Sequence, residues 1–75
     1  MNINEVVKKE NVNKKYIVNY EGRELVVKIV KCSGDNYDVV RIIKDDENGY
    51  MDRYLAEFMY MSKILSLKFE EYKEK

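Results

Sequence analysis

The sequence contains no histidine and a single cysteine, Cys32, among its 75 residues. A lone cysteine cannot form an internal disulfide, and without histidine its thiol lacks the usual activating base. A metal site would need several carboxylates or thiolates brought together, and no such set is present. No group of side chains meets the requirements of an enzyme site. We therefore predict a protein that is not an enzyme and that binds no cofactor or metal.

Net charge and long apolar runs are also missing. The 14 basic residues balance the 14 acidic ones, which argues against a general nucleic-acid-binding protein, because such proteins are usually basic. We therefore expect no direct sequence-specific binding of nucleic acid. Residues 1–10 lack the apolar run of a signal peptide, and no segment approaches the roughly 20 apolar residues of a membrane span. These absences predict a cytoplasmic protein with no membrane partner.

The length of the chain predicts one domain, residues 1–75. A domain this small buries only about 60% of its unfolded surface. It therefore often needs a disulfide, a metal or an oligomer for stability. Since neither a disulfide nor a metal is expected, we expect oligomerisation or a binding partner to supply the additional stability.

The first half of the chain predicts a short helix followed by a β-hairpin. Asn2 or Asn4 can cap a helix that runs to about Glu10. The alternating stretches 14–20 and 23–32 predict two strands, joined by a two-residue loop with glycine at its second position. This loop fixes the register, with Val18 opposite Leu25 and Tyr16 opposite Val27, and gives a core face of Tyr16, Val18, Tyr20, Leu25, Val27 and Ile29.

A third strand is predicted at 37–44, after a turn at 33–36. We place Val40 and Ile42 inward, because the opposite choice would put Arg41 in the middle of the core. Acidic residues follow the strand, and before a helix they are favourable to its dipole. They lack the ligand spacing of a calcium loop and are interpreted as a solvated helix start.

Residues 48–72 predict one long helix with two apolar stripes. The broad stripe is expected to cover the sheet and consists of Met51, Tyr54, Leu55, Phe58, Met61, Leu65, Phe69 and Tyr72. The narrow stripe faces the other way and consists of Ala56, Tyr60, Ile64 and Leu67. A contiguous apolar row on a helix surface indicates a protein interface. We expect Tyr60, Ile64 and Leu67 to form it, most simply as a homodimer through this helix; alternatively, the N-terminal helix folds over them.

The predicted fold class is therefore α+β. It consists of a short N-terminal helix, a three-stranded antiparallel β-meander and a long C-terminal helix packed on one face.

The opening sequence MNINEVVK (1–8) and the segment KYIVNYEG (15–22) resemble a family of small prophage-encoded anti-CRISPR proteins, which inhibit type II CRISPR nucleases. Residues 25–29, 34–37 and 45–50 continue the resemblance, which covers about the first two-thirds of the chain. Members of this family imitate DNA with acidic side chains. The matching positions, and hence the implied protein-binding residues, are Asp35, Asn36, Asp38, Asp45, Asp46 and Glu47.

The chain differs from the family in two ways: it is neutral where the family is strongly acidic, and it is predicted to end in one helix where the family has two. Inhibition of a different CRISPR effector, or use of the apolar stripe, therefore stays open. The resemblance implies a phage or prophage anti-defence protein that binds a bacterial CRISPR effector without catalysis in the host cytosol, with blocked DNA recognition as one implied mechanism. The alternative is a homodimeric structural or regulatory interaction module with no anti-CRISPR role.

Overall fold

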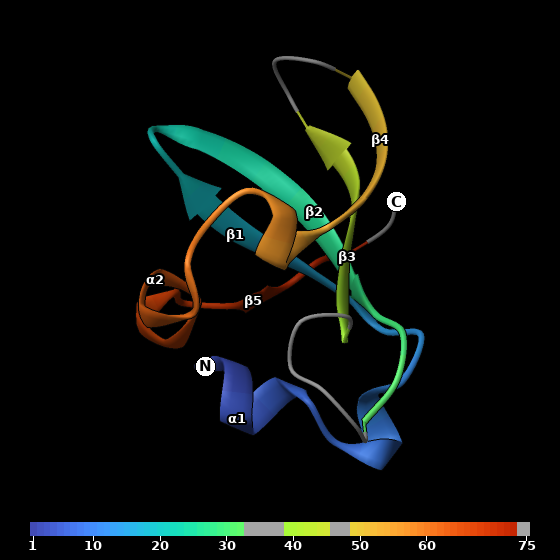
Figure 1. The fold of residues 1–75 in the computed structure, drawn as a ribbon. Helices are drawn as coiled ribbons and strands as arrows, with labels where there is room; N and C mark the ends of the chain where they lie inside the picture. Colours follow the sequence, from blue (N-terminus) through green and yellow to red (C-terminus); the bar gives the residue numbers. More distant parts are fainter. Residues whose placement is uncertain (33–38, 46–48, 74–75) are drawn as a thin grey trace.

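The computed structural model describes residues 1–32, 39–45 and 49–73. Its strands form one five-stranded antiparallel sheet in the order β4-β3-β2-β1-β5 (Figure 1). In chain order the elements are α1 (Ile3–Val6), the 3-10 turn η1 (Lys9–Asn11), β1 (Lys15–Tyr20), β2 (Arg23–Ile29), β3 (Val40–Asp45), β4 (Gly49–Tyr54), the 3-10 turn η2 (Leu55–Glu57), α2 (Met61–Ser66) and β5 (Glu70–Glu71).

The first hairpin confirms the prediction from the sequence. Glu21 and Gly22 both have positive φ, 50° and 81°, which is the backbone conformation of the tight turns that suit the twist of paired strands. The register is the expected one, with the pairs Val18–Leu25 and Tyr16–Val27. The expected inward side chains of both strands are buried except Tyr20, which is half-buried.

The N-terminal helix begins as predicted but ends earlier. The Asn2 side chain accepts a hydrogen bond from the Glu5 amide at 3.0 Å, and the Glu5 carboxylate accepts one from the Asn2 amide at 3.0 Å. This reciprocal capping box satisfies two amides that a helix start leaves without partners. The helix ends at Val6 and Lys8 is extended, so the expected continuation to about Glu10 is replaced by η1.

Val40 and Ile42 of β3 point into the core, as the sequence predicted. A β-bulge between Ile42 and Lys44 then shifts the alternation of the strand. Lys44 is exposed, and Asp45 becomes a buried residue at the end of β3. An extra residue in one strand moves every following side chain to the other face, and alternation alone does not reveal it.

The predicted long helix over 48–72, and with it the three-stranded meander under a single helix, is wrong. Gly49 has a φ of 77° and lies opposite Asp45 at the start of β4, and Tyr54 lies opposite Arg41. This glycine follows Asn48, and an Asn-Gly dipeptide between strand-forming residues is a strong hairpin signal. Our prediction gave more weight to the helical spacing of the apolar residues that follow. The chain therefore continues the sheet where we expected a helix.

The rest of the expected helix divides into short elements. Among the described residues, the α-helices are α1 and α2, of four and six residues. The predicted broad stripe is divided accordingly: Leu55 and Phe69 are buried, Phe58 is only half-buried, and Leu65 is 50% exposed. No helix in the described ranges is long and apolar enough to cross a membrane.

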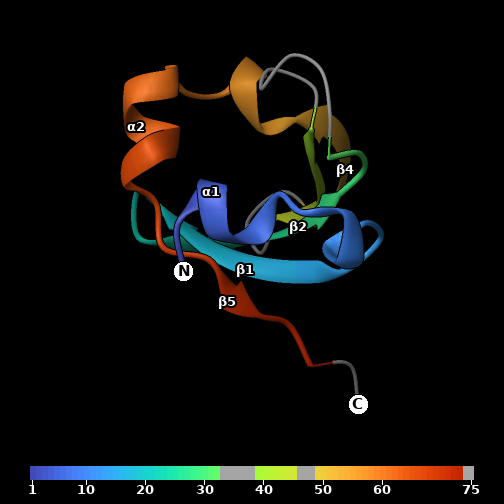
Figure 2. The same ribbon diagram turned by 90° about the horizontal axis from the view of Figure 1, so that it is seen from below.

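The core lies on the inner side of the curved sheet. Figure 2 shows α1, η2 and α2 together on this side. The sheet contributes Tyr16, Val18, Leu25, Val27, Ile29, Val40 and Ile42, and the other segments contribute Ile3, Val6, Val39, Leu55, Met59, Ile64, Leu67 and Phe69. Because these short elements bury their side chains against one another and the sheet, tertiary packing, not intrinsic helix stability, holds them in place.

The two end segments of the chain lie side by side. Phe69 donates its amide to the Met1 carbonyl at 2.6 Å, and the Met1 nitrogen donates to the Phe69 carbonyl at 3.1 Å. The Phe69 ring meets Tyr16 edge to face, with centroids 6.3 Å apart. β5 then pairs with Tyr16 and Ile17 of β1. Together, the contacts of Phe69 and the pairing of β5 fix the direction in which the chain leaves α2.

Candidate functional site

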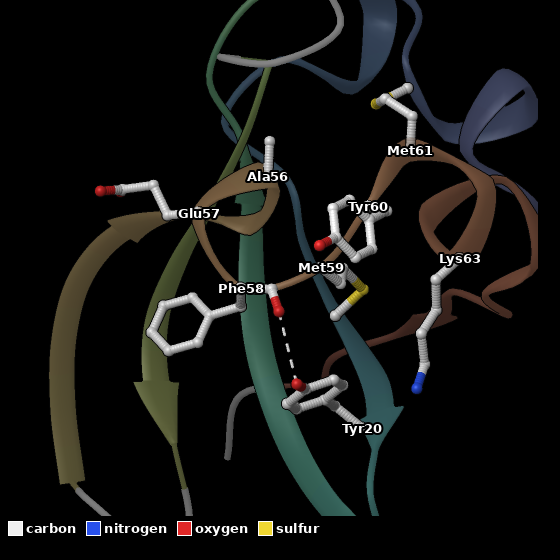
Figure 3. A pocket seen from close by; sticks show the side chains of 8 residues that line it. All are labelled: Tyr20, Ala56, Glu57, Phe58, Met59, Tyr60, Met61 and Lys63. Atoms are coloured by element: carbon white, nitrogen blue, oxygen red, sulfur yellow. Dashed lines mark hydrogen bonds between the residues drawn. The ribbon is translucent and has the colours of Figure 1, made fainter.

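A groove of about 510 Å³ opens between the end of β1 and the segment that joins η2 to α2 (Figure 3). This volume lies within the usual range of ligand sites, about 300–1,000 Å³. The groove is lined by Tyr20, Ala56, Glu57, Phe58, Met59, Tyr60, Met61 and Lys63. We call it the Tyr20–Tyr60 groove.

The outer wall of the groove is held in place by its backbone. Glu57 accepts a hydrogen bond from the Tyr54 amide at 2.7 Å, which caps the start of η2. At the other end, the Tyr60 carbonyl accepts the amides of Lys63 at 2.9 Å and Ile64 at 3.1 Å, which begins α2. Met59 is buried between these two turns. The backbone position of Tyr60 is therefore set by anchored residues on both sides.

Tyr60 is the most exposed large apolar side chain in the described part of the chain, at 88%. Exposed apolar residues are common singly, but one beside a groove of aromatic and thioether side chains indicates a contact surface. Met59 and Met61 line the same groove, and methionine adapts its shape to irregular partners. Tyrosine is enriched among the residues that dominate binding energy at interfaces.

Tyr20 forms the floor of the groove. Its hydroxyl donates a hydrogen bond to the Phe58 carbonyl at 3.4 Å (Figure 3). Two cations lie against its ring: the Arg23 guanidinium carbon at 5.5 Å and the Lys63 ammonium nitrogen at 5.1 Å from the centroid. Arg23 is also ion-paired with Asp45 at 3.5 Å. In contrast, no carboxylate of the described residues lies within ion-pair distance of the Lys63 ammonium.

The predicted interface of Tyr60, Ile64 and Leu67 is divided by the fold. Tyr60 is exposed in the groove, but Ile64 and Leu67 are buried, at 1% and 8% exposure. The helix is only six residues long and Leu67 already has extended geometry, so there is no continuous helix face. Instead, α1 lies against α2, which is the alternative that the sequence left open. The homodimer surface that we predicted on this helix face is therefore wrong for Ile64 and Leu67.

Most of the predicted acidic surface lies outside the described residues, namely Asp35, Asn36, Asp38, Asp46 and Glu47. The remaining member, Asp45, is fully buried at the end of β3 and paired with Arg23. A buried carboxylate that already has a cationic partner cannot present its charge to another protein. Its predicted role in imitating DNA is therefore wrong, because the β-bulge turns this side chain inward.

The outer face of the sheet carries a second polar cluster. Strand register aligns Lys15, Lys28, Arg41 and Tyr54 across four strands. Arg41 donates a hydrogen bond from Nε to Asp52 and one of 3.2 Å from Nη1 to the Tyr54 hydroxyl, and its guanidinium carbon lies 4.9 Å from the Tyr54 ring centroid. The hydrogen bond from Arg41, with the charges of Arg41 and Lys28, lowers the pKa of Asp52. Arg41, Asp52 and Tyr54 thus already bind one another, so the Tyr20–Tyr60 groove is the better candidate site.

No three potential ligand side chains lie close enough together to hold a metal ion in the described ranges. Cys32 is an exposed free thiol.

The groove was not predicted from the sequence, because Tyr20 and Phe58 were both expected in the core. The Asn48-Gly49 dipeptide is the signal that could have revealed the groove. It predicts a hairpin turn, and therefore a strand followed by loops in place of a long helix.

Comparisons with protein-family models, curated proteins and solved structures find no match to this chain.

Proposed function

We propose that this protein acts without catalysis, by binding a protein partner through the Tyr20–Tyr60 groove. The observation that carries the proposal is the exposed Tyr60 ring at the edge of an apolar groove. The backbone around Tyr60 is fixed by the start of α2 and by buried Met59, so binding through its ring requires little ordering of the main chain.

The resemblance to the anti-CRISPR family supports a bacterial CRISPR effector as the partner. The protein would then be a phage or prophage anti-defence inhibitor that acts in the host cytosol. Because Asp45 is buried, we propose an apolar contact through the groove as the main source of affinity. Inhibition would follow when the bound protein covers a surface that the effector needs for DNA.

The experiment is a DNA cleavage assay with a purified type II CRISPR nuclease and its guide RNA, titrated with the protein. We expect inhibition that falls at least about tenfold in Tyr60→Ala, the loss typical of an interface hot spot. Leu65→Ala is the matched control, because Leu65 is also an exposed apolar residue of this region but does not line the groove. It should inhibit like the parent protein.

Three outcomes would contradict parts of the proposal. The absence of both inhibition and binding would remove this class of effector as the partner. Equal affinity of Tyr60→Ala and the parent protein would remove the groove. If sedimentation gives a dimer that Tyr60→Ala dissociates, a second copy of the chain occupies the groove, and the homodimeric module is the correct function.

A further inference from the structure

We infer that the Tyr20–Tyr60 groove accepts a peptide segment in which a large apolar side chain lies next to a carboxylate, and that Lys63 is the counter-charge of that carboxylate. This inference rests on the proposed function of the groove as a partner-binding site, and it specifies the chemistry of what the groove binds.

The apolar half of this ligand follows from the walls of the groove. Tyr20, Phe58, Tyr60 and two methionines supply aromatic and thioether surface around a space of about 510 Å³. An apolar side chain that enters this space removes its own surface and theirs from water, which is the main favourable term in association. The methionines can adjust to aliphatic or aromatic shapes, so the walls select size and polarity more than one residue type.

The acidic half follows from the charges around Tyr20. Its ring has Arg23 and Lys63 as cationic neighbours. Arg23 is balanced by the carboxylate of Asp45, whereas none of the carboxylates that the structure describes pairs with Lys63. Figure 3 shows the Lys63 side chain extending toward the Tyr20 ring along the groove. Glu57 also lines the groove, but its carboxylate accepts the Tyr54 amide, and Figure 3 shows it pointing away from Lys63. The cation of Lys63 is therefore available to an incoming anion.

Binding of an apolar group would exclude water from this cation. A neutral or basic segment would then cover a charge without compensating it, and that costs affinity. A carboxylate at the edge of the groove would replace the lost hydration and add an attraction that strengthens as water leaves. The same arrangement would thus favour acidic apolar segments and disfavour basic ones.

The test uses small probes, because they report on the groove without the rest of a partner. N-acetyl-L-phenylalanine carries an aromatic ring and a carboxylate, and N-acetyl-L-phenylalaninamide is its neutral counterpart. Binding is followed by NMR through the labelled methyl groups of Met59 and Met61, which line the groove. We expect the acid to bind about two- to fivefold more tightly than the amide, as a partly exposed ion pair allows, and added salt to reduce this preference.

Lys63→Gln should remove the preference for the acid, because the acid loses its counter-charge and the amide no longer covers an uncompensated cation. Lys68→Gln is the matched control, because Lys68 is another exposed lysine of this region that does not line the groove. It should keep the preference. Equal affinity of the two probes for the parent protein would overturn the role of Lys63. If neither probe shifts the two methionine signals, the groove does not accept this class of ligand.

The probes and the nuclease assay separate the two proposals. Tyr60-dependent inhibition without a preference for the acidic probe would overturn this inference and leave the proposed function standing. A Lys63-dependent preference without inhibition would support the chemistry of the groove and remove the nuclease as the partner.

Discussion

Arg23 and Asp45 form an ion pair between two strands, with Nη1 and Oδ2 3.5 Å apart and the aspartate side chain only 1% exposed. The pair ties the start of β2 to the end of β3, and it also positions Arg23 against the Tyr20 ring at the floor of the groove. A carboxylate this deeply buried is tolerated because it has a cationic partner. The pair therefore links the stability of the sheet to the electrostatics of the candidate site.

Removing the buried carboxylate should destabilise the fold. Asp45→Ala leaves the positive charge of Arg23 beside the core, and loss of one partner of a buried pair costs about 3 kcal/mol or more. Urea denaturation measures the loss. Asp52→Ala is the control, because Asp52 also pairs with an arginine of the sheet but its side chain is 69% exposed. It should change the unfolding midpoint little. Equal, small effects of both substitutions would place Asp45 at the surface.

Gly49→Ala distinguishes a hairpin from a helix at this position by the sign of its effect. Gly49 has a φ of 77°, and an added Cβ would meet nothing within 4 Å, so strain of the backbone is the only cost. We expect a loss of about 1 kcal/mol. If residues after 48 were helical, the same change would add about 0.8–1 kcal/mol of stability. Gly22→Ala, at a φ of 81° in the first hairpin, is the control and should also destabilise.

The adjacent residues Ile64 and Leu65 should respond very differently to truncation. Ile64 is 1% exposed and Leu65 is 50% exposed. Ile64→Ala leaves a cavity between α2 and the core, which costs about 2–5 kcal/mol. Leu65→Ala should cost about 1 kcal/mol or less, because much of its side chain is already in water. Thermal unfolding followed by circular dichroism tests the pair. A larger loss in Leu65→Ala would restore the two-stripe helix of the sequence prediction.

The carboxyl group of Asp52 should titrate below its ordinary pKa of 3.8, because Arg41 donates a hydrogen bond to its ionised form. A lowered pKa in the folded state means that this contact stabilises the fold above pH of about 4. The contribution is lost as the pH falls through the lower, folded-state value. NMR titration of the side-chain carbon measures the pKa directly. Arg41→Gln should return it toward 3.8, whereas an unchanged value would show that the hydrogen bond is absent in solution.

The first hairpin, and an N-terminal cap at Asn2 or Asn4, could be predicted from the sequence. Asn2 and Glu5 lie three residues apart, and the turn Glu21-Gly22 stands between two alternating stretches, so both features depend on neighbours in the chain. The inward facing of Val40 and Ile42 was also readable, because only one face of β3 avoids a central arginine. The bulge that buries Asp45 was not, since an extra residue leaves no mark on alternation.

For residues 49–73 the sequence offered one local signal, the Asn48-Gly49 dipeptide, and the path of the chain beyond β4 depended on long-range contacts. The apolar residues of this segment recur at helical spacing, but β4 pairs with β3, and β5 pairs with β1, which lies more than 50 residues earlier in the chain. Backbone pairing of sheet edges and burial of Leu55, Ile64 and Phe69 outweighed local helix propensity, which is a weak preference. The groove exists only because this segment breaks into short turns that leave Tyr60 outside. Its chemistry was in the sequence, but the partners of each side chain depend on contacts that no local pattern encodes.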